Sequence, residues 1–409
     1  NSPVMIWHIW TKNTLKIGLT LGLLMPFSCK SQAEQGSLRP IPAAQNLSRY
    51  LPLLQGKQIG LVANQTSVVK NRDDESLGYT HLADTLQSLG IALKKVFAPE
   101  HGFRGTADAG AHISNGIDQN TGLQVISLYG VNKKPRVEDL VGIDLMIFDI
   151  QDVGVRFYTY ISTLHYVMEA CAEQNIPLIV LDRPNPNAHY IDGPILKDGF
   201  NSFVGMHPVP VVYGMTIGEY AKMINGESWL DGQVKTNLTV ISVENYDHNT
   251  AYVLPIPPSP NLRSKQAIAL YPSLCFFEGT PISAGRGTDR PFEMFGAPYL
   301  NAERYPFEFR PIARQGAKWA KFKDEICHGL DLGQITPREH LELGWLIDMY
   351  NEAPDKEDFF NTFFDKLAGT DQLKKDIQAG LTKAEIYTSW VKELEDFKEI
   401  RAQYLIYPD

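Results

Sequence analysis

The sequence lacks the short motifs that mark several large enzyme classes. It has no G-x-G-x-x-G after its first predicted strand, no Walker phosphate loop, no G-x-S-x-G elbow and no H-E-x-x-H helix. Nucleotide-dependent, serine-hydrolase and zincin chemistry therefore lose support. We expect the protein to work without a cofactor and without a bound metal ion.

Cysteine is scarce, with 4 in 409 residues, and no two of them form a C-x-x-C pair. This pattern argues against a disulfide scaffold and against a cysteine-rich zinc site. Cys171 stands in an apolar helical pattern, which predicts a buried thiol.

Positive charge is also in short supply, because 38 Lys and Arg stand against 47 Asp and Glu and give a formal net charge of -9. Nucleic-acid binders usually carry a basic stripe, so we expect no nucleic-acid partner. The chain shows no internal repeat and no low-complexity segment. Its length and its 44% of hydrophobic residues allow two domains with a sizeable core.

The N-terminal segment has the pattern of an export signal. Lys12 and Lys16 precede an apolar run over residues 17–27. This run is too short for a membrane span, and Cys29 follows it. We expect residues 1–35 to be a signal and linker, with Cys29 lipidated. Pro26 stands where lipoprotein signals usually carry an aliphatic residue, so ordinary signal cleavage is the alternative. Either way we expect an exported protein of a Gram-negative bacterium, periplasmic or anchored in the outer membrane.

Strand-like and helix-like segments alternate through the first half of the chain. Apolar runs predict strands at 59–63, 93–97, 125–128, 145–149 and 176–181, and helical periodicity appears at 81–89 and 161–173. This alternation predicts an α/β protein with a Rossmann-like, doubly wound and mainly parallel sheet over residues 45–256. The proline-rich stretch 255–260 marks the boundary to a smaller C-terminal domain, residues 257–409. Capping boxes at Thr216 and Thr382 predict helix starts.

Polar clusters follow the predicted strands at 64–66, 100–101, 149–152 and 182–185. Parallel strands share one direction, so these clusters are expected along one edge of the sheet, where α/β proteins bind ligands. Four polar strand ends on one edge predict a cleft.

Glu100 is the strongest acid/base candidate in that cleft. Burial beside Pro99 and Phe103 would favour its protonated form, whereas pairing with Arg104 would favour the carboxylate, and the sequence leaves both open. His101 either tunes Glu100, acts as a second acid or base, or has a structural role.

Other side chains near these strand ends have more than one interpretation. Asp149 and Asp152 either bind a sugar hydroxyl, hold a divalent cation or pair with Arg156. Tyr158 and Tyr160 would face the same way in an extended segment and either stack on a sugar or line the core. The further binding candidates among these strand ends are Asn64, Arg104, Gln151, Arg183, Asn185 and Asn187.

Two arginines occur in a glycine-containing segment of the C-terminal half. Arg286 and Arg290, on either side of Asp289, would clamp a substrate carboxylate or lock a long loop through an Arg–Asp network.

Four motifs, at residues 98–105, 149–160, 182–187 and 286–292, together resemble the NamZ family of exo-β-N-acetylmuramidases, once a domain of unknown function. The resemblance runs from about Gln58 to the C-terminus in the same motif order. It implies a Rossmann-like domain, an α+β C-terminal domain that completes the cleft, and no nucleotide. It also implies release of N-acetylmuramic acid from the non-reducing end of peptidoglycan-derived muropeptides or disaccharides during cell-wall turnover, with Glu100 as the catalytic glutamate.

The second catalytic group stays open at this point. Asp149 or Asp152 is one possibility and Tyr158 another, because some glycosidases use a tyrosine nucleophile. Two other functions compete with the glycosidase. One is a metal-assisted hydrolase that uses Asp149, Asp152 and Asp182 as ligands. The other is a cell-wall-binding lipoprotein without catalysis.

Overall fold

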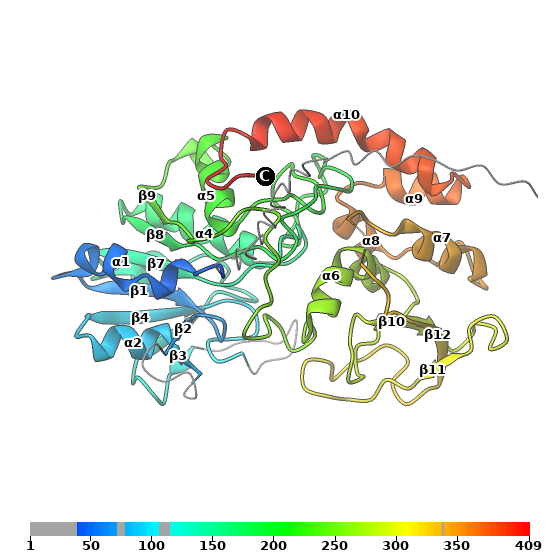
Figure 1. The fold of residues 1–409 in the computed structure, drawn as a ribbon, viewed down its shortest axis with the longest axis horizontal. Coiled ribbons are helices and arrows are strands. Elements are labelled where there is room, and N and C mark those ends of the chain that lie inside the picture. Colours follow the sequence, from blue (N-terminus) through cyan, green and yellow to red (C-terminus); the bar gives the residue numbers. More distant parts are fainter. Residues whose placement is uncertain (1–38, 72–77, 106–114, 338) are drawn as a thin grey trace, which may run out of the picture. The chain divides into compact units, whose positions relative to one another are not determined.

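Seven strands form one sheet in the order β5-β6-β4-β1-β7-β8-β9 (Figure 1). All neighbours pair in parallel except β5, an antiparallel edge strand. The strands are β1 (Ile59–Ala63), β4 (Leu93–Ala98), β5 (Gly116–Ile117), β6 (Gln124–Ser127), β7 (Leu145–Asp149), β8 (Leu178–Leu181) and β9 (Leu238–Ile241). A short hairpin of β2 (Val68–Lys70) and β3 (Tyr79–His81) accompanies them.

This computed structural model describes residues 39–71, 78–105, 115–337 and 339–409, which belong to one compact unit. The predicted export signal and Cys29 lie outside the described residues. In the described part of the chain, no helix has both the length and the apolar character needed to span a membrane.

Each strand of the sheet sends alternate side chains to opposite faces, and both faces are covered. From β7, Met146 and Phe148 join one buried cluster, whereas Leu145 and Ile147 join the other. The first cluster includes residues of α4 (Tyr160–Glu173) and α5 (Ile217–Gly226), and the second includes residues of α1 (Leu47–Leu54) and α2 (Leu82–Ser88). The predicted doubly wound architecture is therefore confirmed.

The strand order places the point where the chain reverses direction across the sheet at β1. From β1 the chain builds outward through β4 and β6, and it then returns to add β7, β8 and β9 on the other side. In such sheets the crevice beyond the carboxyl ends of the strands near this point is the usual ligand site.

A smaller antiparallel sheet, in the order β10-β12-β11, belongs to the C-terminal part together with most of the remaining helices. Its strands are β10 (Met294–Ala297), β11 (Phe307–Phe309) and β12 (Cys327–Asp331). The helices are α6 (Lys265–Leu274), η4 (Cys275–Gly279), α7 (Leu343–Glu352), α8 (Thr362–Ala368), α9 (Gln372–Gln378) and α10 (Lys383–Arg401). Three short helices lie earlier in the chain, namely η1 (Ala43–Gln45), α3 (Val137–Leu140) and η3 (Asp231–Gln233).

Both predicted capping boxes are present, with Thr216 opening α5 and Thr382 opening α10. Residues 255–260 lie between β9 and α6, outside any helix or strand. The domain boundary that we placed there stays a prediction.

The C-terminal segment returns to the large sheet and ends beside α5 (Figure 1). The backbone N–H groups of Ile406 and Tyr407 donate to Glu219, and the Tyr407 hydroxyl donates to Asp182 at 2.6 Å. These bonds tie the last residues to the carboxyl end of β8.

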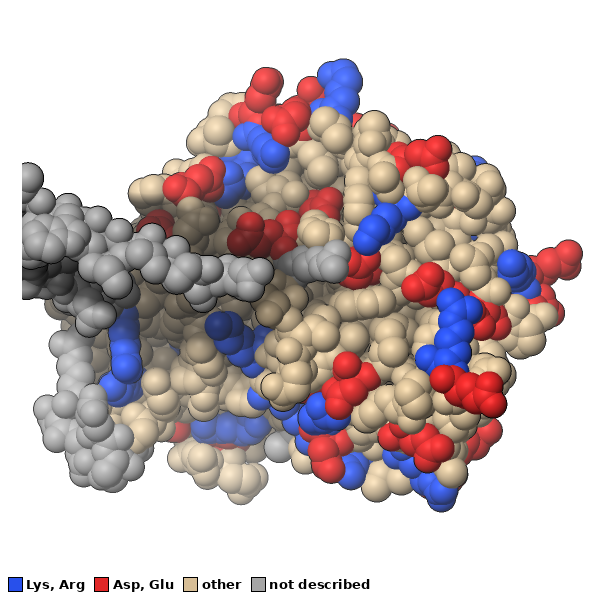
Figure 2. Space-filling view, turned by 45° about the vertical axis from the view of Figure 1, so that its right-hand side comes forward, with Lys and Arg blue, Asp and Glu red and all other residues tan. Residues whose placement is uncertain are grey.

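Charges on the visible surface are mixed in sign. Figure 2 shows acidic and basic side chains interspersed over the face that it presents, in keeping with a modest net charge of -9. Cys171, Cys275 and Cys327 are buried free thiols, as predicted for Cys171.

Candidate active site

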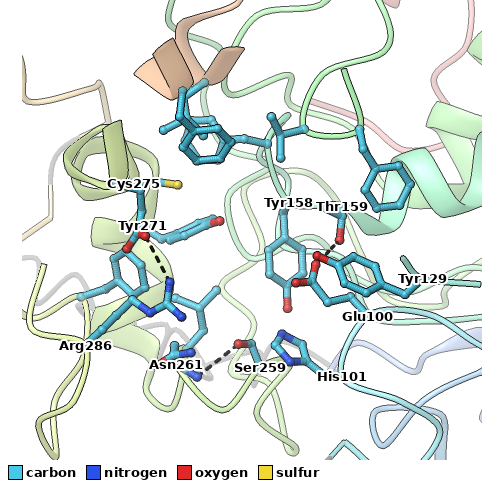
Figure 3. A pocket seen from close by; sticks show the side chains of 18 of the residues that line it. Glu100, His101, Tyr129, Tyr158, Thr159, Ser259, Asn261, Tyr271, Cys275 and Arg286 are labelled. Carbon is cyan, nitrogen blue, oxygen red and sulfur yellow. Dashed lines mark hydrogen bonds and ion pairs between the residues drawn. The ribbon is translucent and has the colours of Figure 1, made fainter. Parts of the chain in front are cut away.

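A cavity of about 540 Å³ opens beyond the carboxyl ends of β4, β6 and β7 (Figure 3). Its size falls within the usual range for small-molecule sites. Both the large sheet and the C-terminal part contribute to its walls. The residues that line it are Glu100, His101, Tyr129, Gly130, Lys133, Phe157, Tyr158, Thr159, Phe203, Val204, Ser259, Asn261, Leu262, Tyr271, Cys275, Glu278, Arg286, Phe292, Phe363 and Leu367.

A strained turn directly after β4 positions Glu100. Gly102 donates its N–H to the Pro99 carbonyl at 3.0 Å, which closes the turn. His101 has a φ of 69° and Gly102 a φ of 81°, both in the left-handed region. Residues other than glycine rarely adopt this backbone conformation, and backbone strain of this kind concentrates at functional sites. The turn directs Glu100 and His101 into the cavity.

Two hydroxyl-bearing side chains lie against the Glu100 carboxylate. Thr159, at the start of α4, donates its hydroxyl to Glu100 Oε2 at 2.8 Å. Tyr129, which follows β6, also contacts Glu100. Burial and the nearby Glu100 charge raise the pKa of Tyr129 well above its usual value, so its hydroxyl stays protonated. Residues that follow β6 and open α4 thus fix the orientation of this carboxylate.

A second carboxylate, Glu278 of η4, lines the same cavity. Arg286 Nη1 donates to Glu278 Oε2 at 3.1 Å, and Arg286 Nη2 donates to the Gly316 carbonyl at 3.1 Å. Arg286 lies on the opposite side of the cavity from Glu100 (Figure 3). Burial, a hydrogen bond with Cys275 and the charges of Glu278 and Glu100 all raise the pKa of Tyr271. Tyr271 therefore lies within electrostatic reach of both carboxylates.

The proline-rich stretch forms part of the cavity wall. The hydroxyls of Tyr158 and Tyr160 both donate to the Pro258 carbonyl, at 2.9 and 3.0 Å. Asn261 donates its backbone N–H to Ser259 Oγ at 3.1 Å and its side-chain amide to the Gly316 carbonyl at 2.7 Å. These bonds hold Ser259 and Asn261 at the cavity surface.

Tyr158 is a poor candidate for a nucleophile. Its ring lines the cavity, but its hydroxyl is bonded to Pro258, and burial raises its pKa well above the usual value. A tyrosine nucleophile must reach the phenolate form, which this environment opposes. The structure places the Tyr160 hydroxyl on Pro258 as well and leaves Tyr160 out of the cavity lining.

Asp149 does not reach the cavity, and this corrects the prediction that it is a catalytic carboxylate. Arg183 binds it in a bidentate ion pair, with Nε 2.6 Å from Oδ1 and Nη2 2.8 Å from Oδ2, and both side chains are buried. Arg183 is for the same reason not placed to bind substrate. Parallel strands did bring the two residues to one edge, but they bind each other there.

Asp152 and Gln151 are likewise buried behind the cavity. Asp152 accepts hydrogen bonds from the Tyr213 hydroxyl and the Gly154 N–H, and burial raises its pKa to about 6. The amide of Gln151 donates to the Asp152 and Pro184 carbonyls at 2.7 Å each. Both predictions of direct contact with substrate are corrected by these contacts.

The aspartates proposed as metal ligands are separated by their partners. Asp182 accepts from Thr216, Tyr407 and the Gly218 N–H, whereas Asp149 binds Arg183. In the described ranges no group of three His, Cys, Asp or Glu side chains has an arrangement that could hold a metal ion. The metal-assisted alternative therefore loses the site on which it rested.

Arg156 and Arg104 also have structural partners. The Arg156 guanidinium is fully buried and donates to the carbonyls of Pro194, Val209, Leu367 and Ala368, so that it joins the large sheet to α8. Arg104 donates to Asp118 at 2.7 Å and to Asp84 at 3.4 Å. Arg104 therefore does not pair with Glu100, which was one of the two alternatives that the sequence left open.

The remaining amide and charged candidates lie outside the cavity lining. Asn185 donates to the Met215 carbonyl and Asn187 to the Val153 carbonyl, at 2.8 and 2.9 Å. Asn64 accepts from Thr66, at the turn after β1.

The predicted carboxylate clamp of Arg286 and Arg290 is not formed. Arg290 pairs with Asp331, and Asp289 pairs with Arg314. Of the predicted residues, the cavity lining contains Glu100, His101, Tyr158 and Arg286.

Several residues of the cavity were not predicted from the sequence. Tyr129 and Lys133 follow β6, and their position after a parallel strand is the signal that could have identified them. Asn261, Tyr271 and Glu278 lie on segments with no motif, and their role follows only from the folded chain.

Two carboxylates in one small cavity at the edge of a Rossmann-like sheet are an arrangement that suits a glycosidase. Profiles described as "Exo-beta-N-acetylmuramidase NamZ, N-terminal" and "C-terminal" match residues 59–266 and 269–407. The chain therefore belongs to the NamZ family.

Known relatives agree with this assignment. The peptidoglycan beta-N-acetylmuramidase NamZ of Bacillus subtilis is 38% identical over 385 residues, which cover 88% of this chain and 89% of that protein. A crystal structure of a DUF1343 family protein from Bacteroides fragilis superposes with a TM-score of 0.83 at 42% identity, covering 91% of this chain and 100% of that one. A second DUF1343 structure from that organism gives 0.76 at 30% identity, with 90% and 99% covered.

Proposed function

We propose that this protein is an exo-acting β-N-acetylmuramidase that releases N-acetylmuramic acid from the non-reducing end of peptidoglycan fragments in cell-wall turnover. The observation that carries the proposal is the position of Glu100, the glutamate of the family motif, in a cavity that also holds a second carboxylate. The substrates are muropeptide-derived glycans that end in this sugar.

Glu100 acts as the general acid in this proposal. It protonates the glycosidic oxygen as the bond to the anomeric carbon breaks, so the leaving sugar departs as a neutral alcohol. Thr159 and Tyr129 are positioning residues, because their hydroxyls lie against the carboxylate and hold it toward the cavity.

Glu278 is the proposed partner of Glu100. Among the described residues, Glu100 and Glu278 are the two acidic side chains that line the cavity. Most glycosidases place a second carboxylate across the sugar from the acid, as nucleophile or as base for water. Glu278 forms an ion pair with Arg286, which lies on the opposite side of the cavity from Glu100 (Figure 3).

The cellular location is a further part of the proposal. The basic residues, the apolar run and Cys29 at the N-terminus support export and a lipid anchor, which would bring the enzyme to cell-wall fragments outside the cytoplasm. Replacement of Cys29 by Ser should move the protein from the membrane fraction to the soluble fraction of the producing cell and remove labelling by a fatty-acid analogue.

The decisive experiment measures turnover of a chromogenic N-acetylmuramide. The wild type should release the chromophore, and Glu100→Gln should lose activity by about two to four orders of magnitude while it keeps its thermal unfolding profile. Glu173→Gln is a matched control, because this exposed carboxylate at the end of α4 pairs with Lys134 and does not line the cavity. Its activity should equal that of the wild type.

Three results would overturn the proposal. Equal rates for the wild type and Glu100→Gln would remove Glu100 from the chemistry. Retained sugar binding without any turnover by the wild type would favour the cell-wall-binding alternative. Loss of activity with a chelator and recovery with magnesium would restore the metal-assisted one.

A further inference from the structure

Lys133 is a cavity residue with an unusual environment. It lies after β6 and is half-buried in the cavity wall. Its Nζ lies 4.7 Å from the centre of the Phe203 ring. Phe203 in turn packs against Tyr129 and stacks on Tyr166, with ring centres 6.0 and 6.3 Å apart. The ammonium group is thus held on an aromatic surface that borders the Glu100 side of the cavity.

Other cations near the site already have partners in the protein, either carboxylates or, for Lys321 and Arg156, backbone carbonyls. Arg286 pairs with Glu278, and the neighbouring Lys134 lies 2.7 Å from both Glu169 and Glu173. Arg104 and Arg183 pair with Asp118 and Asp149. Within the described part of the chain, no carboxylate forms an ion pair with Lys133. The ammonium group of Lys133 makes a cation–π contact with the Phe203 ring.

A cation on an aromatic face is attracted to the ring but keeps its capacity to bind an anion. The three donors of the ammonium remain to be satisfied by water or by a ligand. An anionic group that enters the cavity would lie among two acidic side chains, Glu100 and Glu278, so it needs a cation that is not already neutralised. Lys133 meets this requirement.

The proposed substrate carries such an anionic group. N-acetylmuramic acid differs from N-acetylglucosamine by a lactyl ether on O3, which ends in a carboxylate. We propose that Lys133 binds this lactyl carboxylate and thereby selects N-acetylmuramic acid over N-acetylglucosamine. This assignment rests on the proposed function and replaces the Arg286–Arg290 clamp that the structure does not form.

The test separates recognition of the carboxylate from recognition of the sugar. In the Glu100→Gln background, calorimetry measures the affinity for three probes: N-acetylmuramic acid, its methyl ester at the lactyl group, and N-acetylglucosamine. Lys133→Met should weaken binding of the acid by about tenfold to a hundredfold. Binding of the ester and of N-acetylglucosamine should not change. Lys133→Arg should retain most of the preference for the acid.

The kinetic readout uses the active enzyme. On the chromogenic muramide, Lys133→Met should raise KM by a similar factor with kcat little changed, because the lost interaction is made in the ground state and in the transition state alike. Lys356→Met is the matched control. Lys356 is exposed and has the same kind of contact, with its Nζ 5.3 Å from the centre of the Tyr350 ring, but it does not line the cavity.

The outcomes distinguish this assignment from the proposed function. Turnover by the wild type, together with unchanged discrimination in Lys133→Met, overturns the role of Lys133 alone. Equal weakening of all three probes does the same, because it indicates a general effect on the cavity. Absence of both turnover and muramic acid binding in otherwise folded wild-type protein overturns the function and the assignment together.

Discussion

The hydroxyl of Thr159 donates a hydrogen bond of 2.8 Å to Oε2 of Glu100. The two residues are 59 positions apart in the chain, and they meet because β4 and β7 end at the same edge of the sheet. Thr159 is buried at the start of α4, so the donor is fixed before any substrate arrives.

Replacement of Thr159 by Val removes this donor with little change in volume. Hydrogen bonds to charged groups contribute about 1.5–3 kcal/mol, so we expect kcat/KM to fall by roughly tenfold to a hundredfold. Thr159→Ser keeps the hydroxyl and should stay close to the wild type. Steady-state kinetics on the chromogenic muramide would measure both. Equal losses in the two variants would instead indicate a general disturbance of packing at this position and not loss of the hydrogen bond.

The Asp149–Arg183 ion pair should matter for stability and not for chemistry. Asp149→Asn leaves the buried Arg183 guanidinium without its bidentate partner, which should reduce the free energy of unfolding by about 3–5 kcal/mol. Urea unfolding measures this loss. The double variant with Arg183→Met should be less destabilised than the sum of the single variants, because it leaves no unpaired charge.

Activity distinguishes this structural role from a catalytic one. The folded fraction of Asp149→Asn should turn over substrate at close to the wild-type rate. A stable Asp149→Asn protein without activity would return Asp149 to the catalytic candidates.

The carboxyl ends of the strands show which features of the fold and site can be predicted from local sequence patterns. They predicted the sheet, its mainly parallel order and Glu100 at a strand end, because burial and strand direction follow from local periodicity. They also placed Asp149 and Arg183 at the same edge. The patterns did not reveal that these two bind each other, since a polar strand end has the same local sequence whether it faces a ligand or a neighbour.

Arg156 illustrates the same limit. Its guanidinium donates to carbonyls of residues up to 212 positions away, on α8, and such partners exist only in the folded chain. Glu278 was missed for the converse reason. It lies on the short helix η4 without a motif, and only the packing of the C-terminal part brings it to the cavity.

His81 should make the protein sensitive to acid. Its Nδ1 accepts from the Ala83 N–H at 3.1 Å, and its Nε2 lies 2.9 Å from the Asn64 carbonyl, which fits a neutral ring. Burial, followed by the charge of Arg104, lowers the pKa of His81 from 6.5 to about 4. The unfolded chain therefore takes up this proton first, and stability that is present above pH 6.5 is lost as the pH falls toward 4.

The shift corresponds to about 3 kcal/mol, which should appear in the slope of unfolding free energy against pH. His81→Asn keeps an N-cap side chain for α2 but does not titrate, so its slope between these pH values should be shallower than that of the wild type. Parallel pH curves for the two proteins would show that His81 is not the group responsible.

Gly154 should tolerate no side chain. Its φ is +75°, and a Cβ at this position would lie 2.2–2.6 Å from the side-chain atoms of Asn185. We expect Gly154→Ala to lower the free energy of unfolding by about 3 kcal/mol, from strain and overpacking together. Gly56→Ala is the matched control. Its φ is +72° with no atom within 4 Å of the added Cβ, so about 1 kcal/mol should be lost in urea unfolding. Equal losses would mean that Asn185 moves aside.

Glu278 is the residue on which the proposed mechanism depends most directly after Glu100. Glu278→Gln should lower kcat by at least about a hundredfold, because no other carboxylate of the cavity lining faces Glu100 in the described structure. Asp289→Asn is the control, since Asp289 is an exposed acid of the same region that pairs with Arg314. A rise in KM with unchanged kcat would assign Glu278 to binding and not to catalysis.

Azide tests whether the Glu278 carboxylate acts on the face of the sugar opposite the leaving group. In Glu278→Ala, azide can attack the anomeric carbon in place of the group that is lost, so the products are a glycosyl azide and the free leaving sugar. Attack on the face opposite the leaving group gives the α-azide whether the wild type inverts or retains, and the anomer that the wild type first releases, read by NMR, then separates inversion from retention. A β-muramide hydrolysed first to the α-sugar makes Glu278 a base for water, and one hydrolysed first to the β-sugar makes it a nucleophile.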